Sequence, residues 1–251
     1  MELLGERISG EQDQLLQSER LATIGKFASD MAHEIKNPLQ AILTFFEYLP
    51  KKYDDPDFRE RFSKIAKEEA QRISDLVKEL ATYANPRPPQ FAPVEISQVL
   101  DSVLALLEND LHKHRVTLQK GYSHSPMRIE ADLDQMKQVF LNLILNAVEA
   151  MSPLEGKENL LEIVAYPNGK VLVVKLRDTG CGIEPGRIPV IFAPFFTTKE
   201  RGSGLGLSIV QNVLRAHHAT IEVESQVGQG TTVTLTIPVR QPAVTGSSKA
   251  A

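Results

Sequence analysis

The sequence predicts an α+β protein in two parts: a two-helix antiparallel hairpin that forms a four-helix bundle in a dimer, and an α/β sandwich behind it. Three observations lead to this fold class. Apolar residues recur every three or four positions over 21–49, four prolines occupy 85–93, and short helical and strand patterns follow residue 94. The first pattern indicates packed helices, and the last indicates one mixed sheet with helices on one face.

Bulk composition narrows the class of protein. The chain has 251 residues, a formal net charge of −4 and one cysteine. Lys and Arg dominate no face, so we expect no nucleic-acid partner, and a single cysteine suits a reducing, cytoplasmic setting. No apolar run approaches the roughly 20 residues of a membrane span. We expect no membrane contact by this segment, although a longer parent protein could be anchored upstream.

Breaks in composition divide the chain into expected domains. The prolines of 85–93 make a stiff, extended linker, which is the clearest boundary. The expected divisions are a coiled-coil lead-in at 1–17, a helical dimerisation domain at 18–84, the linker at 85–93, a second domain at 94–240 and a disordered tail at 241–251.

The first helix is expected over 21–49 and sets the frame for His33. In a heptad register from Leu21, the a and d positions are Leu21, Ile24, Ala28, Met31, Ile35, Pro38, Ile42, Phe45 and Leu49. His33 takes an f position in this register and points away from the apolar seam. Asn37, one turn on, also points away from the seam. Pro38 removes a backbone donor, so we expect a kink beside His33.

The second helix is expected over 58–83, after a turn at 50–57 and with Asp57 as its cap. A short connection makes the two helices antiparallel. One hairpin with a wide apolar stripe cannot bury that stripe alone, so we expect a homodimer.

The second domain should contain three helices and six strands. The helices are expected at 96–109, 132–151 and 208–216, and the strands at 116–120, 127–130, 160–166, 171–177, 220–225 and 231–239. Turn residues at 168–169 and 227–230 predict that the last four strands form two hairpins.

Two polar features of this domain suggest nucleotide binding. Asn142 and Asn146 are four residues apart and share a helix face opposite Leu141, Leu145 and Val148. Their amide oxygens suit Mg²⁺ that shares substrate phosphates, although the spacing alone equally fits a solvated helix face. The run DTGCG at 178–182 follows a strand and lets the backbone approach a planar ligand, while Asp178 accepts from an amine. By itself it also fits a plain turn.

A third feature is the glycine-rich run KERGSGLGL at 199–207, which opens a helix. Free N–H groups and the positive end of the helix dipole would face a phosphate there, with Lys199 adding charge. The preceding run IFAPFFTTK has no strand alternation, and a loop of this length between the two glycine motifs is typical of a lid.

Taken together, these motifs resemble those of the sensor histidine kinases of two-component signalling. AHEIKNPL at 32–39 resembles the H-box, NLILNAVEA at 142–150 the N-box, DTGCGI at 178–183 the G1 box, FAPFFTTK at 192–199 the F-box and GSGLGL at 202–207 the G2 box; GQGTT at 228–232 resembles a closing glycine motif. The match covers about 18–238, and its H-box is similar to the nitrogen-regulation branch. It implies a HisKA-type dimerisation and phosphotransfer domain before a Bergerat (GHKL, HATPase_c) ATP-binding domain.

The resemblance also implies roles for particular residues. His33 would be the phosphoacceptor, Glu34 its base or orienter, and Asn37 the residue that positions water for a phosphatase reaction. Asp178 would bind the adenine amino group, Asn146 would hold Mg²⁺ and Asn142 would lie close to the metal. The remaining nucleotide contacts implied are Gly180, Gly182, Phe196, Thr198, Lys199, Gly202, Gly204, Leu205, Gly206 and Thr232. The implied partners are ATP with Mg²⁺, a second copy of the chain and the receiver domain of a response regulator.

Two other classes remain open at this point: an ATPase of the same fold whose hairpin only dimerises it, and a scaffold without catalysis. The other histidines, namely His112, His114, His124, His217 and His218, lack metal-ligand spacing and are expected on the surface. Cys181 is expected to be a small loop residue and not a nucleophile.

The residue type at position 142 distinguishes a kinase from an ATPase of the same fold. The related gyrase-type ATPases carry a glutamate four residues before the metal-binding asparagine, as the base that activates water. Asn142 stands at that position here and cannot take a proton. We therefore expect Asn142→Glu to raise futile ATP hydrolysis, measured as phosphate release. A variant that binds ATP normally but shows no gain would contradict this interpretation.

Overall fold

The computed structural model describes residue 25 and residues 31–122, 127–151, 158–199 and 202–241. The predicted lead-in at 1–17 and the predicted tail beyond Gln241 lie outside these residues. The chain divides into two units, one built from residues up to Arg87 with 197–205, the other from Pro88–Phe196 with the residues from Gly206 on. Among the described residues, no helix combines the length and apolarity that crossing a membrane requires.

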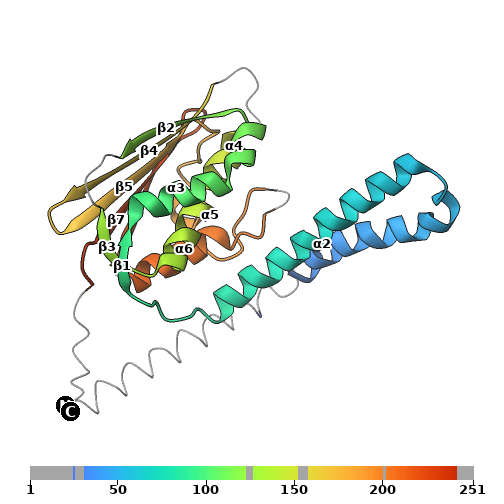
Figure 1. Cartoon of the computed structure of the whole chain (residues 1–251), viewed down its shortest axis with the longest axis horizontal. Helices are drawn as coiled ribbons and strands as arrows, with labels where there is room; N and C mark the ends of the chain where they lie inside the picture. The colour runs from blue at the N-terminus through green and yellow to red at the C-terminus, as the bar shows by residue number, and fades with distance from the viewer. Residues whose placement is uncertain (1–24, 26–30, 123–126, 152–157, 200–201, 242–251) are drawn as a thin grey trace, which may run out of the picture. The chain divides into compact units, whose positions relative to one another are not determined.

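The first unit contains the predicted antiparallel hairpin (Figure 1). Residues 31–52 are helical without a break at Pro38, and α2 covers Pro56–Ala84. The ring of Phe45 lies 5.8 Å from the rings of both Phe58 and Phe62 across the hairpin. Aromatic contacts at this distance stabilise the closed end of the hairpin. The helical continuity through Pro38 is confirmed, and the kink stays a prediction.

The cap of α2 differs from the expectation. Asp55, not Asp57, precedes the helix, and its Oδ1 accepts from the N–H groups of Asp57 and Phe58 at 3.0 and 3.2 Å. The prediction that Asp57 caps this helix is therefore wrong. Pro56 explains the shift, because proline at the first helical position lacks only an N–H that would have no helical partner.

The hairpin leaves large apolar side chains exposed. Leu39, Leu43 and Phe46 follow one another at helical spacing on the first helix and are 46%, 52% and 52% exposed, and Val77 on α2 is 50% exposed. Leu39, Leu43 and Phe46 form an apolar stripe next to the a/d seam. Such a face on a helical hairpin is typical of a surface that another protein chain covers.

The second unit is built on a mixed sheet with the order β2-β4-β5-β7-β6. β2 and β4 are parallel and the other neighbours are antiparallel. The strands of this sheet are β2 (Val116–Tyr122), β4 (Asn159–Asn168), β5 (Val171–Asp178), β6 (Thr220–Gln226) and β7 (Gly230–Pro238). The helices are α3 (Ile96–Leu106), α4 (Glu108–Lys113), α5 (Leu133–Met151) and α6 (Gly206–Ala216). Figure 1 shows the helices on one face of the sheet, which confirms the predicted sandwich.

Two details of this unit depart from the sequence pattern. The helix expected at 96–109 is interrupted at Leu107, between α3 and α4. A short strand, β1 (Ala92–Glu95), pairs antiparallel with β3 (Arg128–Ala131) and was not expected. Pro93 hides this strand in the sequence, since proline is tolerated only where the ladder does not need its N–H.

The core lies between α5 and the sheet. Phe140 and Ile144 of α5 have no exposed surface, and neither do Ile163 of β4, Val174 of β5 and Leu235 of β7. Alternation along β5 puts Val174, Leu176 and Asp178 on the same face. The strand that packs against α5 therefore delivers Asp178 to the helix side of the sheet at its last residue.

His217 is the histidine whose expected position was wrong. It has no exposed surface, its Nδ1 lies 2.8 Å from the carbonyl oxygen of Val213, and its Nε2 accepts from the N–H of Asp132 at 3.0 Å. Burial lowers the pKa of His217, an effect that His218 reinforces and that the Val213 carbonyl and Asp132 oppose. The side chain is thus held as neutral imidazole. His112 and His218 are exposed as expected, His114 is half-buried, and His124 lies outside the described residues.

This burial predicts a pH dependence of the stability of the second unit. The unfolded chain takes up a proton at His217 near the ordinary pKa of about 6.5, and the folded chain does so only at lower pH. The contribution to the free energy of unfolding is therefore present above pH 6.5 and is lost as the pH falls toward the folded pKa. Urea unfolding between pH 8 and 5 should show a weaker pH dependence in His217→Gln. His112→Gln, at an exposed position, should keep the wild-type dependence; equal slopes in all three proteins would contradict the assignment.

Candidate functional site

Asp178 is the central residue of the candidate site in the second unit. It ends β5 and is 6% exposed. Its Oδ1 accepts from the N–H of Gly180 at 2.8 Å and from the N–H of Thr231 at 3.2 Å. Two backbone donors on one oxygen fix the orientation of the carboxylate and connect the 178–182 loop to the start of β7.

The glycines of the loop stand where no side chain fits. A Cβ on Gly180 would come within 2.8 Å of both the Ala150 Cβ and the Asp178 Oδ1. Gly182 has φ +71, and a Cβ there would lie 2.1 Å from the carbonyl oxygen of Gln226. The loop therefore packs its backbone directly on the end of α5 and on the β6–β7 turn. The close approach of a planar ligand to this backbone stays a prediction.

Backbone hydrogen bonds hold Cys181 between the same two elements. Its N–H donates to the carbonyl of Ala150 at 3.0 Å, and its carbonyl accepts from the N–H of Gly228 at 2.7 Å. The Cys181 residue itself is exposed. Main-chain hydrogen bonds therefore hold the loop in position. This agrees with the expectation that residue 181 is a small loop residue.

Thr231 is a residue that sequence reasoning missed. It is 9% exposed, its N–H binds Asp178, and its hydroxyl lies 2.8 Å from that of Ser225. Thr232, which the closing motif indicated, pairs instead with Arg177 on β5. Adjacent strand residues face opposite sides of a sheet, so Thr231 lies on the side of Asp178. The alternation with the buried Leu235 and Ile237 could have identified it.

Asn142 and Asn146 lie half-buried on α5. The Nδ2 of Asn142 donates to the carbonyl of Gly206 at 3.3 Å, at the start of α6. Leu141, Leu145 and Val148 were expected on the buried face of α5, and this expectation is only partly right. Val148 is buried, but Leu141 and Leu145 are half-buried. Leu143 and Ile144 are more deeply buried than these two leucines. The 3.6-residue period thus placed the two asparagines on the accessible side of the helix.

α5 connects the two ends of this site. Ala150 contacts the 178–182 loop, Asn142 contacts Gly206, and Asn146 lies midway. Eight residues of helix span about 12 Å. The structure thus brings together an acidic, glycine-lined end, a pair of amide side chains and the N-terminus of a helix along one side of α5. This order suits an extended ligand with a planar polar group at one end and an anion at the other.

Part of the predicted lid belongs to the second unit. A short 3₁₀ turn, Ile188–Val190, is followed by the buried Ile191, and Phe192, Phe195 and Phe196 are half-buried. The Phe196 N–H donates to the carbonyl of Ala193 at 3.2 Å. The segment has no strand, and its phenylalanines are partly covered, as expected of rings that pack the lid.

The glycine-rich segment 197–205 clusters with the first unit. Thr198 and Lys199 are exposed, and the Thr197 hydroxyl accepts from the Lys199 N–H at 3.1 Å. Ser203 donates its hydroxyl to Glu79 on α2 and accepts from the N–H of Leu205. Gly202 and Gly204 are half-buried, and Leu205 is buried. In the described parts of this segment, side-chain hydroxyls thus hold two short turns, one at Thr197 and one at Ser203.

The first unit presents the second set of predicted residues. His33 and Asn37 are exposed on the helix over 31–52, and Glu34 is half-buried. Residues four apart on a helix share a face, so Asn37 is the neighbour of His33 one turn on. Both lie on the accessible side of the helix, where another protein can reach them.

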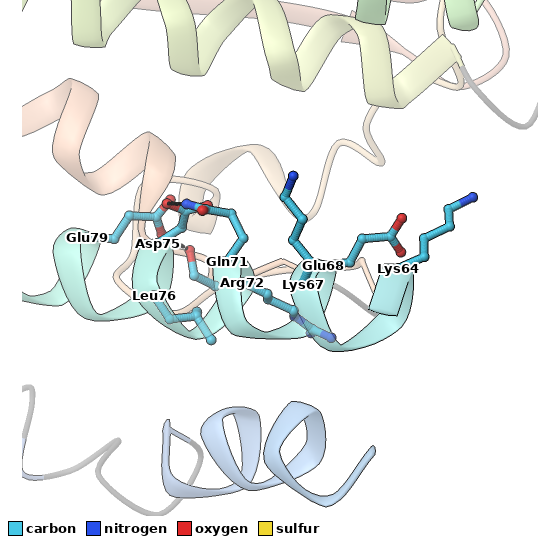
Figure 2. A pocket seen from close by; sticks show the side chains of 9 residues that line it. Lys64, Lys67, Glu68, Gln71, Arg72, Asp75, Leu76 and Glu79 are labelled. Atoms are coloured by element: carbon cyan, nitrogen blue, oxygen red, sulfur yellow. Dashed lines mark hydrogen bonds between the residues drawn. The ribbon is translucent and has the colours of Figure 1, made fainter. Parts of the chain in front are cut away.

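A groove along α2 is a separate feature of the first unit. Figure 2 shows Gln71, Asp75 and Glu79 close together in it, and the Gln71 amide donates to Asp75 at 3.0 Å. Its lining residues are Lys64, Lys67, Glu68, Gln71, Arg72, Asp75, Leu76, Glu79 and Ser203. It carries charges of both signs, and none of these residues was predicted as a site residue. We assign no ligand to it.

Two family models match the chain, one over each part. Residues 131–241 match the family described as histidine kinase-, DNA gyrase B- and HSP90-like ATPase, and residues 23–88 match the His Kinase A (phospho-acceptor) domain. The first match contains Asn142, Asn146 and Asp178, and the second contains His33.

Curated relatives match both parts together. The sensor histidine kinase ZraS of Escherichia coli (strain K12) is 32% identical over 228 residues, which are 91% of this chain and 48% of that protein. The signal transduction histidine-protein kinase AtoS of the same strain is 35% identical over 91% of this chain and 37% of its own length. The chain thus spans about half the length of these relatives, or less.

Solved structures are similar over most of the chain. Histidine kinase ThkA in complex with response regulator protein TrrA is 28% identical, with a TM-score of 0.76 over 92% of this chain and 66% of that one. Full-length ShkA in complex with AMPPNP is 25% identical, with a TM-score of 0.62 over 88% of this chain and 47% of that one.

The backbone packing of the loop predicts that Gly182→Ala destabilises the second unit. Gly228 is a matched control, since it shares a positive φ of +77 but has no atom within 4 Å of the point where a Cβ would stand. Gly228→Ala should cost about 1–2 kcal/mol for the left-handed backbone alone. Gly182→Ala should cost clearly more and should weaken nucleotide binding, measured by urea unfolding and by titration with an ATP analogue. Equal losses of stability would show that the contact with Gln226 has no importance.

Proposed function

Because this chain belongs to the histidine kinases, we propose that it transfers the γ-phosphoryl group of ATP to His33 and then to an aspartate of a response regulator. The observation that carries the proposal is the combination of an exposed His33 within the phospho-acceptor match and a built Asp178 site within the ATPase match. Either part alone would fit another activity, and the two together fit a kinase that phosphorylates itself.

The Asp178 end of the site suits the adenine base. A buried carboxylate whose Oδ1 is fixed by two N–H groups can accept from the exocyclic amine without reorganising. Gly180 and Gly182 pack their backbone on Ala150 and Gln226, where no Cβ would fit, and so hold the loop beside the carboxylate at which a flat ring system is proposed to bind. Thr231 joins Asp178 from β7 and belongs in the proposed contact set, whereas Thr232 lies on the opposite face of the strand.

The other end of the site suits phosphates. The N-terminal N–H groups of α6 and its dipole favour anions at Gly206, and Lys199 is proposed to add charge together with the 202–205 backbone. Asn142 and Asn146 have the neutral amide oxygens that fit Mg²⁺ shared with phosphates. We propose Asn146 as the ligand and Asn142 as its neighbour; the ion supplies charge neutralisation at the phosphates when it is bound.

The transfer itself needs orientation more than activation. A ring nitrogen of His33 attacks the γ-phosphorus, a P–N bond forms, and the bond to the ADP oxygen breaks in line. Glu34 is proposed to orient the imidazole or to accept its proton. The exposed position of His33 then leaves the phosphorylated side chain accessible to the aspartate of the partner.

The partners follow from the same surfaces. The apolar stripe of Leu39, Leu43 and Phe46, with the exposed Val77 of α2, supports a homodimer, in which a second hairpin covers these side chains. The solved relative ThkA was crystallised with the response regulator TrrA, and we propose a receiver domain as the partner here. Asn37, next to His33, is proposed to position water for dephosphorylating that partner. A kinase with these partners works in the cytoplasm, where we expect this segment.

The proposal predicts an acid-labile phosphoprotein that depends on His33. Incubation with γ-³²P-ATP and Mg²⁺ should label the wild type and the control His112→Ala, with label that survives alkali and is lost in acid. His33→Ala should lose at least about 99% of this label, because no other group can replace the acceptor nitrogen.

The same experiment separates the two classes of enzyme. Steady phosphate release without any protein label, in the wild type and in His33→Ala alike, would overturn the kinase assignment. It would leave an ATPase whose helices serve only to dimerise it.

A further inference from the structure

The second half of the prolyl linker is bound to the second unit. α2 ends at Ala84, and the sequence up to residue 93 was expected to be an extended connection. The N–H of Gln90, however, donates to the Oδ2 of Asp132 at 2.8 Å. The ring of Phe91 meets that of His217 edge to face, with 5.2 Å between the ring centres and 75° between their planes. Ala92 then enters β1 and pairs with Ala131.

Asp132 contacts two structural elements with its two oxygens. Its Oδ1 accepts from the N–H groups of Asp134 and Gln135, both at 3.1 Å, and so caps α5. Its Oδ2 takes the N–H of Gln90. The side chain is only 2% exposed. A cap needs one oxygen, so the second oxygen serves the linker.

His217 connects the same point to the end of α6. Its Nε2 accepts from the backbone N–H of Asp132, and its Nδ1 is placed to donate to the Val213 carbonyl. With both nitrogens engaged, the ring is fixed and presents its edge or face to Phe91. Phe91 itself is 42% exposed, so one side of its ring rests on His217 while the remainder is in solvent.

We propose that Asp132 and His217 are positioning residues that clamp Gln90 and Phe91 onto the ATP-binding domain and so set the length of its tether to the phospho-acceptor helices. The tether outside the clamp is then residues 85–89, five instead of the seven that precede β1. At about 3.3–3.6 Å per extended residue, its reach falls from roughly 23–25 Å to roughly 17–18 Å. Three of the five residues are proline, which makes the tether stiff as well as short.

The catalytic consequence rests on the proposed function. Autophosphorylation depends on the effective concentration of the ATP-binding domain at His33, which falls roughly as the −3/2 power of tether length once the sites can be spanned. Lengthening the tether from five to seven residues should therefore lower the rate of autophosphorylation about 1.7-fold. The affinity for ATP should not change, because none of the four clamp residues belongs to the nucleotide site.

Two variants release the clamp while leaving the core intact. Asp132→Ser keeps an N-cap oxygen for α5 but has no second oxygen for Gln90, since serine caps helices about as well as aspartate. Phe91→Ala removes the ring from His217. Leu133→Ala is the matched control, because Leu133 is an apolar residue of similar exposure, 45%, beside Asp132.

The test measures amide hydrogen exchange at Gln90 together with the rate of autophosphorylation and the KM for ATP, on the full chain. We expect slow exchange at Gln90 in the wild type and in Leu133→Ala. Asp132→Ser and Phe91→Ala should show faster exchange and an about 1.7-fold lower rate at unchanged KM. The exchange signal of Gln90 can be separated from that of the preceding residues because residues 86, 88 and 89 are prolines, which have no N–H to exchange.

Fast exchange at Gln90 in the wild type would overturn the clamp. Fast exchange in Asp132→Ser and Phe91→Ala without any change in rate would overturn its positioning role. Absence of any label in the wild type would instead count against the proposed function, and the exchange data would then decide the existence of the clamp independently.

Discussion

The carboxylate of Asp178, held by the N–H groups of Gly180 and Thr231, is the interaction on which the second unit's site depends. It joins the end of β5, the following loop and the start of β7 at one buried oxygen. Gly182 and Gly230 permit this convergence, because a Cβ on either would lie within about 2 Å of a backbone oxygen of Gln226 or Asp178. Buried charge and backbone packing thus fix the carboxylate before any ligand arrives.

α5 extends this constraint across the unit. Its buried side, with Phe140 and Ile144, packs on the sheet, and its accessible side carries Asn142 and Asn146. Its last turn receives the Asp178 loop through Ala150, and its first turn is capped by Asp132. One helix therefore determines the spacing between the Asp178 end, the amide pair and the attachment of the linker. A rigid element of this kind orients site residues better than a loop could.

The candidate residue of the first unit, His33, is exposed, whereas Asp178 in the second unit is buried. The proposed transfer requires two domains or proteins to reach His33 in turn, and the helix holds His33 on the side away from the apolar seam. The hairpin is closed by rings from Phe45, Phe58 and Phe62, while Leu39, Leu43, Phe46 and Val77 stay about half exposed. A packed end and an uncovered stripe are compatible with a hairpin that needs a second copy to complete its core.

The sequence by itself determined most helices and strands, and the order in which the candidate site residues follow one another along the chain. Local periodicity located both helices of the hairpin, α5 and the strand pairs, because side chains repeat every 3.6 or 2 residues wherever one face is buried. The motifs around Asp178 and Asn142 were visible because each is local and is tied to a strand end or a helix face.

Tertiary structure decided what depends on residues distant in the chain. Thr231 reaches Asp178 only through the pairing of β5 with β7, and β1 exists only because Ala131 and Ile129 offer it a partner. His217 looks like a surface histidine in sequence, yet 85 residues separate it from the Asp132 N–H that it accepts. Contacts of this kind have no local signal, because the groups that satisfy a buried polar atom are selected by the packed fold and not by their neighbours in sequence.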